Sequence, residues 1–432
     1  MNFTRRDGKR ICIVTAFLLT GGSDNLLLAI CSRLADVGYQ ITLYAAYPPP
    51  GYGRYGTLQP AFEAYGIKVV NSPRWIKPLL TAMGLIVCAP MLVIYACVAR
   101  FHRERIKIFY KWVYHRIIGK RVDLAHHYLL AARITLDHRT RPYSLVSGYH
   151  GAICPALHLL KQWLPVPVCY TEISSPLWRQ KMDPDERMGT YLNALDRIFV
   201  PSTAIEKELQ VHEHLVSSAQ VMPFVVDLLP RPYRQPTHPA RTFGVIARLS
   251  PEKNQDVLVR LLPKVIAKVP DARLVLIGTG PSESSLRALA TDLGVSGAVE
   301  FIPRFERIDE VIDQIDIVTL LSDVEGMPLT LLEALYYGKP ILATAVGSIP
   351  DMVHNHYNGF IVDKTNSPGI TEHLVEIMTD KECYAAMSEN SRNLYMEYFD
   401  PSVIFKQFCA SIGELTTQDA NKVPGNHYSE DL

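Results

Sequence analysis

The chain has 432 residues, of which 48% are apolar, and its formal net charge at pH 7 is +1. This length allows two or three domains with ample core, and the near-neutral balance gives no general attraction to nucleic acid. The eight cysteines are scattered without a CxxC pair, so the sequence predicts a reducing compartment and neither a disulfide framework nor a zinc site.

The N-terminal part predicts a βαβ unit. A buried strand over Arg10 to Phe17 is followed by a turn at residues 21–23, a helix over Asn25 to Val37 and a second strand over Ile41 to Ala45. The unit lacks a GxGxxG motif, so the sequence does not support a dinucleotide site. Residues 1–230 are predicted to form a first Rossmann-like domain.

Residues 79–99 are 21 uncharged residues, which as a helix would cover about 30 Å of hydrocarbon. A single crossing would separate strands of one sheet, so we expect a re-entrant hairpin broken at Pro90 or a half-buried helix. Residues 100–121 follow with a net charge of +7, which favours an anionic bilayer. The alternative is a buried core helix followed by a solvated basic helix.

The membrane hypothesis therefore covers an insertion over residues of about 73–138, with contact to anionic lipid through residues 79–121. No secretory signal precedes it, because the first ten residues are polar and basic. We expect the protein on the cytoplasmic side of a membrane, attached as a monotopic or peripheral protein.

Later strands are predicted over residues 144–147, 167–171, 197–200 and 220–222. Two polar loops between them are candidates for a cleft and contain His150 and Glu172. By default, a lone His such as His150 between Tyr and Gly is a satisfied loop residue. The Asp183-Pro184-Asp185 motif follows a polar segment rather than a strand, so we interpret it as a helix cap and predict no metal site.

A proline-rich linker over residues 231–241 leads to a second Rossmann-like domain over residues 242–395. A returning helix over residues 396–415 and a polar tail over residues 416–432 end the chain. The first strand of the second domain, residues 242–246, is followed by Arg248 and by Lys253 at the start of a helical pattern. In doubly wound domains, phosphate binds at the end of a strand that leads into a helix. The alternative is that Arg248 and Lys253 are ordinary surface charges, as most Lys and Arg residues are.

The most informative stretch runs from Glu325 to Asp351. A helix is predicted to start at Pro328, continue from Leu329 to Tyr337 and end at Gly338. The amides of residues 326–329 are then donors at a positive helix end. Glu325 and Glu333 lie about 12 Å apart along the axis, which is far enough to address both ends of a nucleoside diphosphate sugar. As an isolated pair they would instead indicate a solvated helix face.

This stretch resembles the signature of retaining glycosyltransferases with the GT-B fold, in the glycosyl transferases group 1 family (family four). The resemblance implies an α/β chain with two Rossmann-like domains facing a central cleft. It also implies that Glu325 contacts the donor sugar, Glu333 the ribose, and Arg248 and Lys253 the diphosphate without a metal. The diphosphate would also meet the amides of Gly326, Met327, Pro328 and Leu329. The sequence departs from the family at Asp351, where Glu is commoner, and at Pro223 to Asp227, where Pro-Asn-Gly-Val-Asp is usual.

In the first domain the resemblance is weaker. It implies that Gly22 faces the donor phosphates and the acceptor, although a plain strand-to-helix turn fits the local chemistry equally well. Family members often carry a functional His in one of the two polar loops. His150 matches the first loop, and Glu172 stands where His is common in the second, so both are candidates for the acceptor side.

The function that we expect is therefore membrane-attached, retaining transfer of a sugar from a nucleoside diphosphate sugar to a lipid-linked or membrane-surface acceptor. The resemblance implies no cofactor and no metal, and His150 joins Glu325, Arg248 and Lys253 as a candidate catalytic residue. A phosphorylase or sugar-nucleotide epimerase of the same fold, or a non-catalytic membrane-bound partner, are the alternatives.

Overall fold

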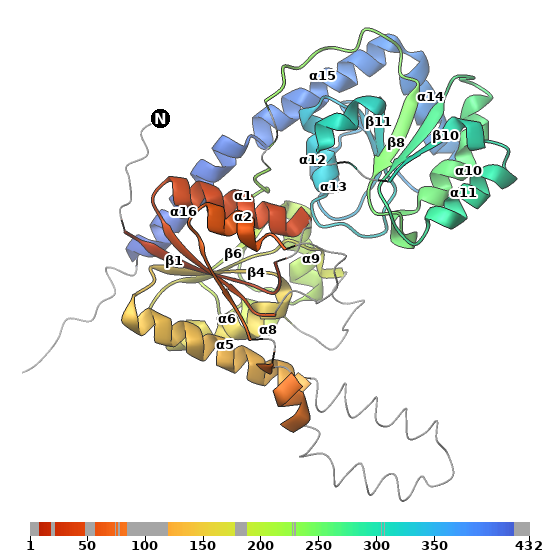
Figure 1. The fold of residues 1–432 in the computed structure, drawn as a ribbon. Coiled ribbons are helices and arrows are strands. Elements are labelled where there is room, and N and C mark those ends of the chain that lie inside the picture. The colour runs from red at the N-terminus through yellow and green to blue at the C-terminus, as the bar shows by residue number, and fades with distance from the viewer. Residues whose placement is uncertain are drawn as a thin grey trace, which may run out of the picture.

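The computed structural model describes residues 8–18, 22–47, 57–73, 75–76, 78–83, 120–177, 188–226, 228, 230–303, 305 and 307–418. Most of the predicted membrane segment, the Asp183-Pro184-Asp185 motif, Asp227 and the end of the polar tail lie outside these residues. Within them, the chain forms two α/β domains, each built on one parallel sheet (Figure 1).

The first domain has a seven-stranded sheet in the order β3-β2-β1-β4-β5-β6-β7. Its strands are β1 (Arg10–Thr15), β2 (Gln40–Ala45), β3 (Lys68–Asn71), β4 (Leu145–Tyr149), β5 (Val168–Thr171), β6 (Arg197–Val200) and β7 (Gln220–Val221). Its helices are α1 (Gly22–Asp36), α2 (Gln59–Ala64), α5 (Lys120–Thr140), η2 (Gly151–Ile153), α6 (Cys154–Trp163), α8 (Gly189–Leu192) and α9 (Thr203–His212).

Alternate residues of β1 face two separate cores. Ile11 and Ile13 pack with α1, α2 and the C-terminal helix α16 (Pro401–Gln418), whereas Cys12 and Val14 pack with α5 and α6. Helices therefore cover both faces of the sheet, as Figure 1 shows. This arrangement is expected of a parallel sheet, because its strands are buried on both sides.

Helix α5 occupies the C-terminal part of the predicted insertion over residues 73–138. Ala131 and Ile134 of α5 are fully buried against the sheet, so residues 120–138 form a covering helix of the first domain. The outer face of α5 carries exposed apolar residues, and the membrane association of the insertion stays a prediction. None of the helices in the described ranges is both long and apolar enough to span a bilayer.

The second domain has a six-stranded sheet in the order β10-β9-β8-β11-β12-β13. Its strands are β8 (Thr242–Ile246), β9 (Arg273–Ile277), β10 (Val299–Ile302), β11 (Ile317–Leu320), β12 (Ile341–Thr344) and β13 (Gly359–Val362). Its helices are η3 (Pro251–Lys253), α10 (Gln255–Ile266), α11 (Glu283–Asp292), η4 (Ser296–Ala298), η5 (Ile308–Glu310), η6 (Ile312–Gln314), α12 (Leu329–Tyr336), α13 (Ile349–Met352), α14 (Ser367–Thr379) and α15 (Lys381–Tyr398).

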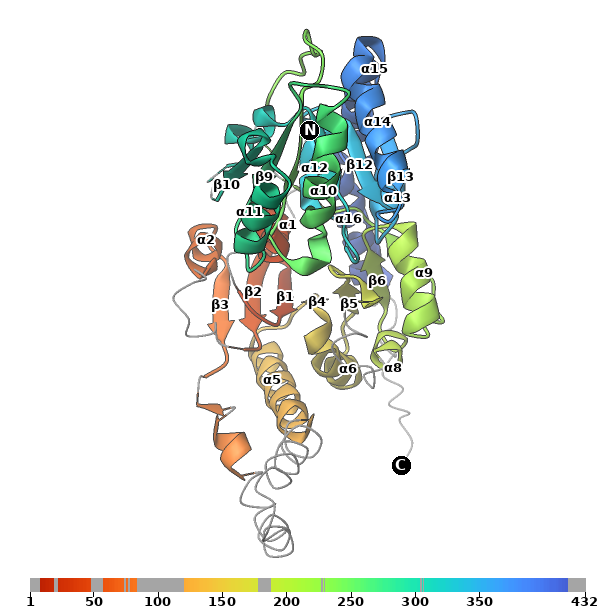
Figure 2. The ribbon, with the colours of Figure 1, turned by 90° about the vertical axis from the view of Figure 1, so that its right-hand side faces the viewer.

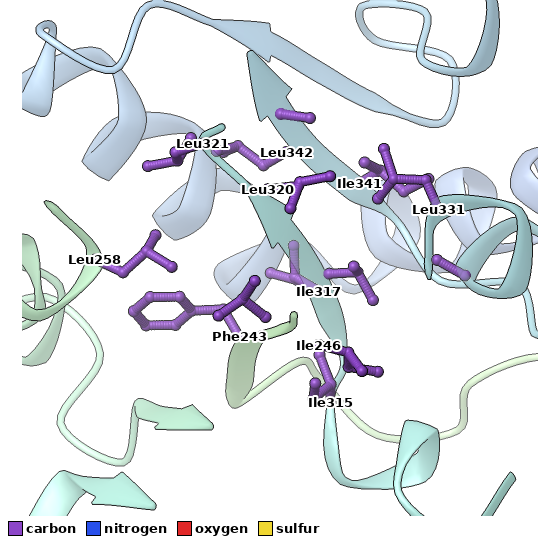
Figure 3. Packing of buried hydrophobic residues seen from close by; sticks show 14 of the residues in the cluster. Phe243, Ile246, Leu258, Ile315, Ile317, Leu320, Leu321, Leu331, Ile341 and Leu342 are labelled. Carbon is purple, nitrogen blue, oxygen red and sulfur yellow. The ribbon is translucent and has the colours of Figure 1, made fainter. Parts of the chain in front are cut away.

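The core of the second domain is centred on β11. Ile317 and Leu320 lie between Phe243 of β8 and Ile341 of β12, and Leu331 packs on them from α12 (Figure 3). In both sheets the strand order reverses direction along the chain, between β1 and β4 in one domain and between β8 and β11 in the other. Ligands of open α/β sheets bind at such switch points, outside the carboxyl ends of the strands.

The two domains contact each other directly, and the second lies above the first in Figure 2. Ser348 Oγ donates a hydrogen bond to Ser202 Oγ at 2.8 Å, and the Thr203 amide donates to Asp351 Oδ2 at 3.1 Å. Helix α16 crosses back and buries Phe405 and Phe408 in the first domain. Asp351, one of the family landmarks, therefore serves a contact between domains.

Candidate functional site

The loops that follow β8 and β11 are tied together at the switch point of the second domain. Asn254, in a left-handed conformation with φ 51°, donates from Nδ2 to the Leu321 carbonyl at 2.8 Å and to Asp323 Oδ1 at 3.0 Å. The Asp323 amide donates to the Glu252 carbonyl at 2.9 Å. The η3 turn that carries Lys253 is thereby held against the segment that leads to Glu325.

This arrangement joins two of the predicted site residues in an ion pair. Lys253 Nζ lies 2.5 Å from Glu325 Oε1, and the two side chains are 19% and 10% exposed. The positions are 72 residues apart in the chain. The pair places a cation and a carboxylate together in the segments that follow the neighbouring strands β8 and β11.

Helix α12 begins beside this pair. Pro328 is the residue before the helix, with φ −71° and ψ 115°, so the helix starts one residue later than predicted. The Pro328 carbonyl accepts from the Leu331 and Leu332 amides at 3.0 and 3.3 Å. The amides of Leu329 and Thr330 thus precede the first bonds of the helix, at its positive end. The helix ends at Tyr336, and Gly338 follows with φ 64°.

The turn before α12 depends on two glycines. A Cβ on Gly347, whose φ is 54°, would meet the Glu325 carbonyl oxygen at 2.1 Å. A Cβ on Gly326 would meet the Ile173 carbonyl oxygen of the first domain at 3.0 Å. Met327 is buried in the core of the second domain. The backbone at Gly326 therefore lies between its own domain and the opposite one.

A pocket of about 960 Å³ extends from Arg248 to Glu333 along the carboxyl ends of β8 and β9. Leu329 and Thr330 form one wall, and Phe305 and residues 277–281 form another. Burial raises the pKa of Glu333 to about 7. A cavity of this size with one carboxylate at its side is suited to a nucleoside.

Arg248 is exposed at the mouth of this pocket. Its carbonyl accepts a hydrogen bond from Gln255 Nε2 at 2.8 Å, which fixes the backbone. Its guanidinium forms no ion pair or hydrogen bond with any of the described residues. The side chain is thus available to an anionic ligand.

The loop Gly278-Thr279-Gly280 after β9 is part of the pocket but was not among the predicted site residues. Gly278 has φ 131°, and a Cβ there would lie 2.1 Å from the Ala247 carbonyl oxygen. A Cβ on Gly280 would lie 2.0 Å from the Leu249 carbonyl oxygen, and the Leu249 amide donates to the Thr279 carbonyl at 3.0 Å. Two glycines directly after a buried strand were the available signal, because they allow such close backbone contact.

On the first domain, Gly22 begins α1 and His150 follows β4, so both lie at the switch point between β1 and β4. His150 has φ 74°, an uncommon conformation for a residue with a side chain. Its Nε2 lies 3.7 Å from Asp24 Oδ1 of α1. The acceptor role of His150 stays a prediction.

Glu172 is 0% exposed, and its carboxylate lies inside its own loop. Its Oε1 accepts from the amides of Ile173 and Ser174 at 3.0 and 2.9 Å. This loop is the one that Gly326 approaches, so Glu172 shapes the contact between domains. Direct contact of Glu172 with an acceptor also stays a prediction.

The described residues contain no cluster of three or more His, Cys, Asp or Glu side chains suited to a metal ion. On the second domain, Arg248 and Glu333 line one pocket, and Lys253 and Glu325 form an ion pair. His150 and Glu172 lie on the first domain.

Comparison with known proteins identifies the second domain. Residues 234–394 match the family model of glycosyl transferases group 1. This domain belongs to the glycosyl transferases group 1 family. The predicted family is confirmed, and all donor-side candidates except Gly22 lie within the matched residues.

Among curated relatives, a GDP-mannose-dependent monoacylated alpha-(1-6)-phosphatidylinositol monomannoside mannosyltransferase of Corynebacterium glutamicum is 37% identical over 155 residues, covering 34% of this chain and 40% of that protein. The N-acetyl-alpha-D-glucosaminyl L-malate synthase of Bacillus anthracis is 29% identical over 167 residues, covering 39% of this chain and 43% of that protein. The chain thus aligns with about two fifths of the length of these relatives.

Solved structures extend the likeness to the whole fold. Anabaena HepE in complex with UDP-glucose has a TM-score of 0.67 at 15% identity, covering 94% of this chain and 100% of that chain. The apo lipopolysaccharide outer core galactosyltransferase WaaB has a TM-score of 0.66 at 15% identity, covering 94% and 99%. The predicted GT-B fold is confirmed by these matches and by the two parallel sheets.

Proposed function

We propose that this group 1 family member is a retaining, metal-independent glycosyltransferase that moves a sugar from a nucleoside diphosphate sugar to a lipid-linked acceptor at a membrane surface. The observation that carries the proposal is the Lys253–Glu325 pair, 2.5 Å apart at the switch point of the second domain. In this pair, Lys253 is a cation that can bind a phosphate, and Glu325 is a carboxylate that can accept hydrogen bonds from sugar hydroxyls.

The donor would lie along α12. Its nucleoside enters the pocket beside Glu333, whose carboxylate accepts hydrogen bonds from the ribose hydroxyls. Its diphosphate meets the amides at the start of α12 and the side chains of Arg248 and Lys253. Fixed cations and helix-start amides neutralise the charge that develops on the leaving diphosphate.

Glu325 would hold the sugar. Because Lys253 lies against its carboxylate, the orientation of Glu325 is fixed. The acceptor hydroxyl then attacks the face of the sugar from which the diphosphate departs and gives its proton to the departing diphosphate oxygen, which retains the anomeric configuration. His150, whose Nε2 lies 3.7 Å from Asp24 Oδ1, would be the acceptor-side group on the first domain.

A lipid-linked acceptor is supported by the outer surface of the first domain. Several large apolar side chains of this domain are exposed: Trp75, Leu79, Met83, Leu124, Tyr128, Leu129, Leu136 and Trp163. The rings of Tyr128 and Trp163 lie 5.9 Å apart. Leu79 and Met83 belong to the segment predicted to meet anionic lipid, residues 79–121, most of which lies outside the described ranges, and Trp75 and Leu124 lie close to its ends in the sequence. The phosphatidylinositol mannoside named for the Corynebacterium relative is an acceptor of the same class.

The test is transfer into lipid. Purified protein is incubated with membranes and a panel of radiolabelled UDP-sugars and GDP-sugars, with Glu325→Gln as the matched control. We expect one donor to label the lipid fraction with the wild type and little label with Glu325→Gln. Phosphate-dependent release of a sugar phosphate, or isomerisation of the donor without an acceptor, would refute transfer.

A further inference from the structure

A second cavity lies between the linker and the second domain. It has a volume of about 420 Å³ and is lined by linker residues 231–238, by the end of α12, and by Lys339, Tyr384 and Ser388. We call it the linker pocket. The linker is fixed there, because the hydroxyls of Tyr233 and Ser388 lie 3.0 Å apart and the Arg231 amide donates to the Tyr336 hydroxyl at 2.9 Å.

Both carboxylates of the linker pocket already have partners. Asp313 pairs with Arg231 at 2.6 Å, and the Arg231 guanidinium also lies over the Tyr337 ring at 5.6 Å. Asp316 Oδ2 accepts from the amides of Arg241 and Thr242 at 2.7 and 2.9 Å. Its Oδ1 accepts from the Tyr384 hydroxyl at 3.2 Å. Both negatively charged side chains of the pocket therefore already bind groups of the protein itself.

Two cationic side chains that line the linker pocket, Lys339 and Arg234, have no such partners among the described residues. The side chains of Lys339 and Arg234 form no hydrogen bond or ion pair with other residues in the described part of the chain. Lys339 is partly buried, and burial is the main cause that lowers the pKa of its ammonium group, against the opposing effect of Asp313 and Asp316. A partly buried ammonium group without a counter-ion is costly, so an anion that reaches it is stabilised.

We infer that the linker pocket binds a small phosphomonoester, with its phosphate between Lys339 and Arg234. An Arg fork and a Lys ammonium are the donors that suit phosphate oxygens. The cavity is larger than inorganic phosphate requires, and the rings of Tyr233, Tyr336 and Tyr337 line the rest of it, which offers an apolar surface to the organic part of the ligand.

The linker pocket is separate from the proposed donor pocket, although one helix serves both. Leu329 and Glu333 on α12 line the donor pocket, whereas Tyr336 at the end of α12 and Tyr337 after it line the linker pocket. Tyr337 also lines a cavity between the domains together with Asn25 of α1. A ligand at the linker would therefore contact the helix that we assign to the donor.

The inference is tested by calorimetry on the full-length protein. Glycerol 3-phosphate, inorganic phosphate and glycerol are titrated separately into protein whose donor site is saturated with UDP or GDP. If neither nucleotide binds, the same titrations are made on the Arg248→Ala/Lys253→Ala double variant, so failure of the donor assignment does not obscure the result. We expect glycerol 3-phosphate to bind at one site per chain, more tightly than inorganic phosphate, and glycerol not to bind.

Two variants assign the site. Lys339→Met and Arg234→Gln should each weaken glycerol 3-phosphate binding about tenfold or more, as expected for a lost charge-assisted hydrogen bond. Arg273→Gln, which removes an exposed cation on β9, is the matched control and should bind as the wild type does. Circular dichroism checks folding, and Arg234 lies on the exposed linker, where substitution leaves the core intact.

The inference is overturned if glycerol 3-phosphate gives no binding heat once the donor site is filled, or if both variants bind it with wild-type affinity. Equal affinities for glycerol 3-phosphate and inorganic phosphate would overturn the assignment to a phosphomonoester.

Discussion

Replacing Lys253 by alanine should separate two consequences of its pairing with Glu325. In the free protein the change leaves a carboxylate that is only 10% exposed without its cation. Loss of one partner of such a pair costs about 2 to 4 kcal/mol of folding free energy, below the upper range for fully buried pairs. For a bound nucleoside diphosphate the change also removes a charge-assisted hydrogen bond, worth about 1.5 to 3 kcal/mol, so affinity should fall about 10-fold to 150-fold.

The double variant Lys253→Ala/Glu325→Gln distinguishes the two effects. It removes the unpaired charge, so it should recover much of the folding stability that Lys253→Ala loses, while nucleotide affinity stays low. Denaturant unfolding measures the first quantity and calorimetry with UDP and GDP measures the second. Arg273→Ala breaks an exposed pair with Glu300 and should change stability by less than about 1 kcal/mol. Wild-type nucleotide affinity in Lys253→Ala would refute the phosphate role, and a double variant no more stable than Lys253→Ala would refute the pairing.

Glu325→Gln should reduce transfer far more than nucleotide binding, whereas Glu333→Ala should weaken both; kinetics and calorimetry showing the reverse pattern would exchange their roles. Burial raises the pKa of Glu333 from 4.5 to about 7, so between these pH values the folded state binds more protons at this group than the unfolded state does. The free energy of unfolding should therefore fall by roughly 3 kcal/mol, through this group alone, as the pH rises from about 4.5 to above 7. In urea unfolding, the Glu333→Gln variant should not show this fall in the free energy of unfolding. Identical dependences on pH for the variant and the wild type would contradict the prediction. Replacing five basic residues by Gln should weaken flotation with anionic liposomes by about 1 kcal/mol per residue and leave nucleotide affinity in detergent unchanged; wild-type flotation would exclude the membrane role. The five are Lys107, Lys111, Arg116, Lys120 and Arg121.

The elements around the donor site could be predicted because their signals are local. A β-branched strand, a proline before a helix and a glycine after it are each recognised within a few residues, and β8 and α12 lie within one residue of the predicted bounds. The pairing of Lys253 with Glu325 could not be predicted this way. It depends on β8 and β11 being neighbours in the sheet, although β9 and β10 lie between them in the chain.

The first domain was harder to predict because its helices carry mixed patterns. In α5 the buried Ala131 and Ile134 share the helix with exposed Leu129 and Leu136, so apolar residues occur on more than one face. Periodicity alone then does not separate a core-facing helix from one that meets a membrane. Only the contacts with the sheet identify the inner face, and the outer apolar residues keep the membrane hypothesis open to the flotation test.

The stretch from Glu325 to Asp351 has a second role that its sequence did not reveal. Glu325 and the start of α12 face the proposed donor, while Gly326, Ser348 and Asp351 contact the first domain. The Ser348 amide also donates to the Gly326 carbonyl at 2.8 Å, which links the two groups of residues. Since one segment holds residues assigned to the donor and residues that contact the opposite domain, a shift of its backbone on donor binding would also change the contact between domains. At Gly347, with φ 54°, a Cβ would lie 2.1 Å from the Glu325 carbonyl oxygen, so glycine is required there, whereas a Cβ on Gly326 would meet the Ile173 carbonyl oxygen at 3.0 Å and make the contact between domains tighter.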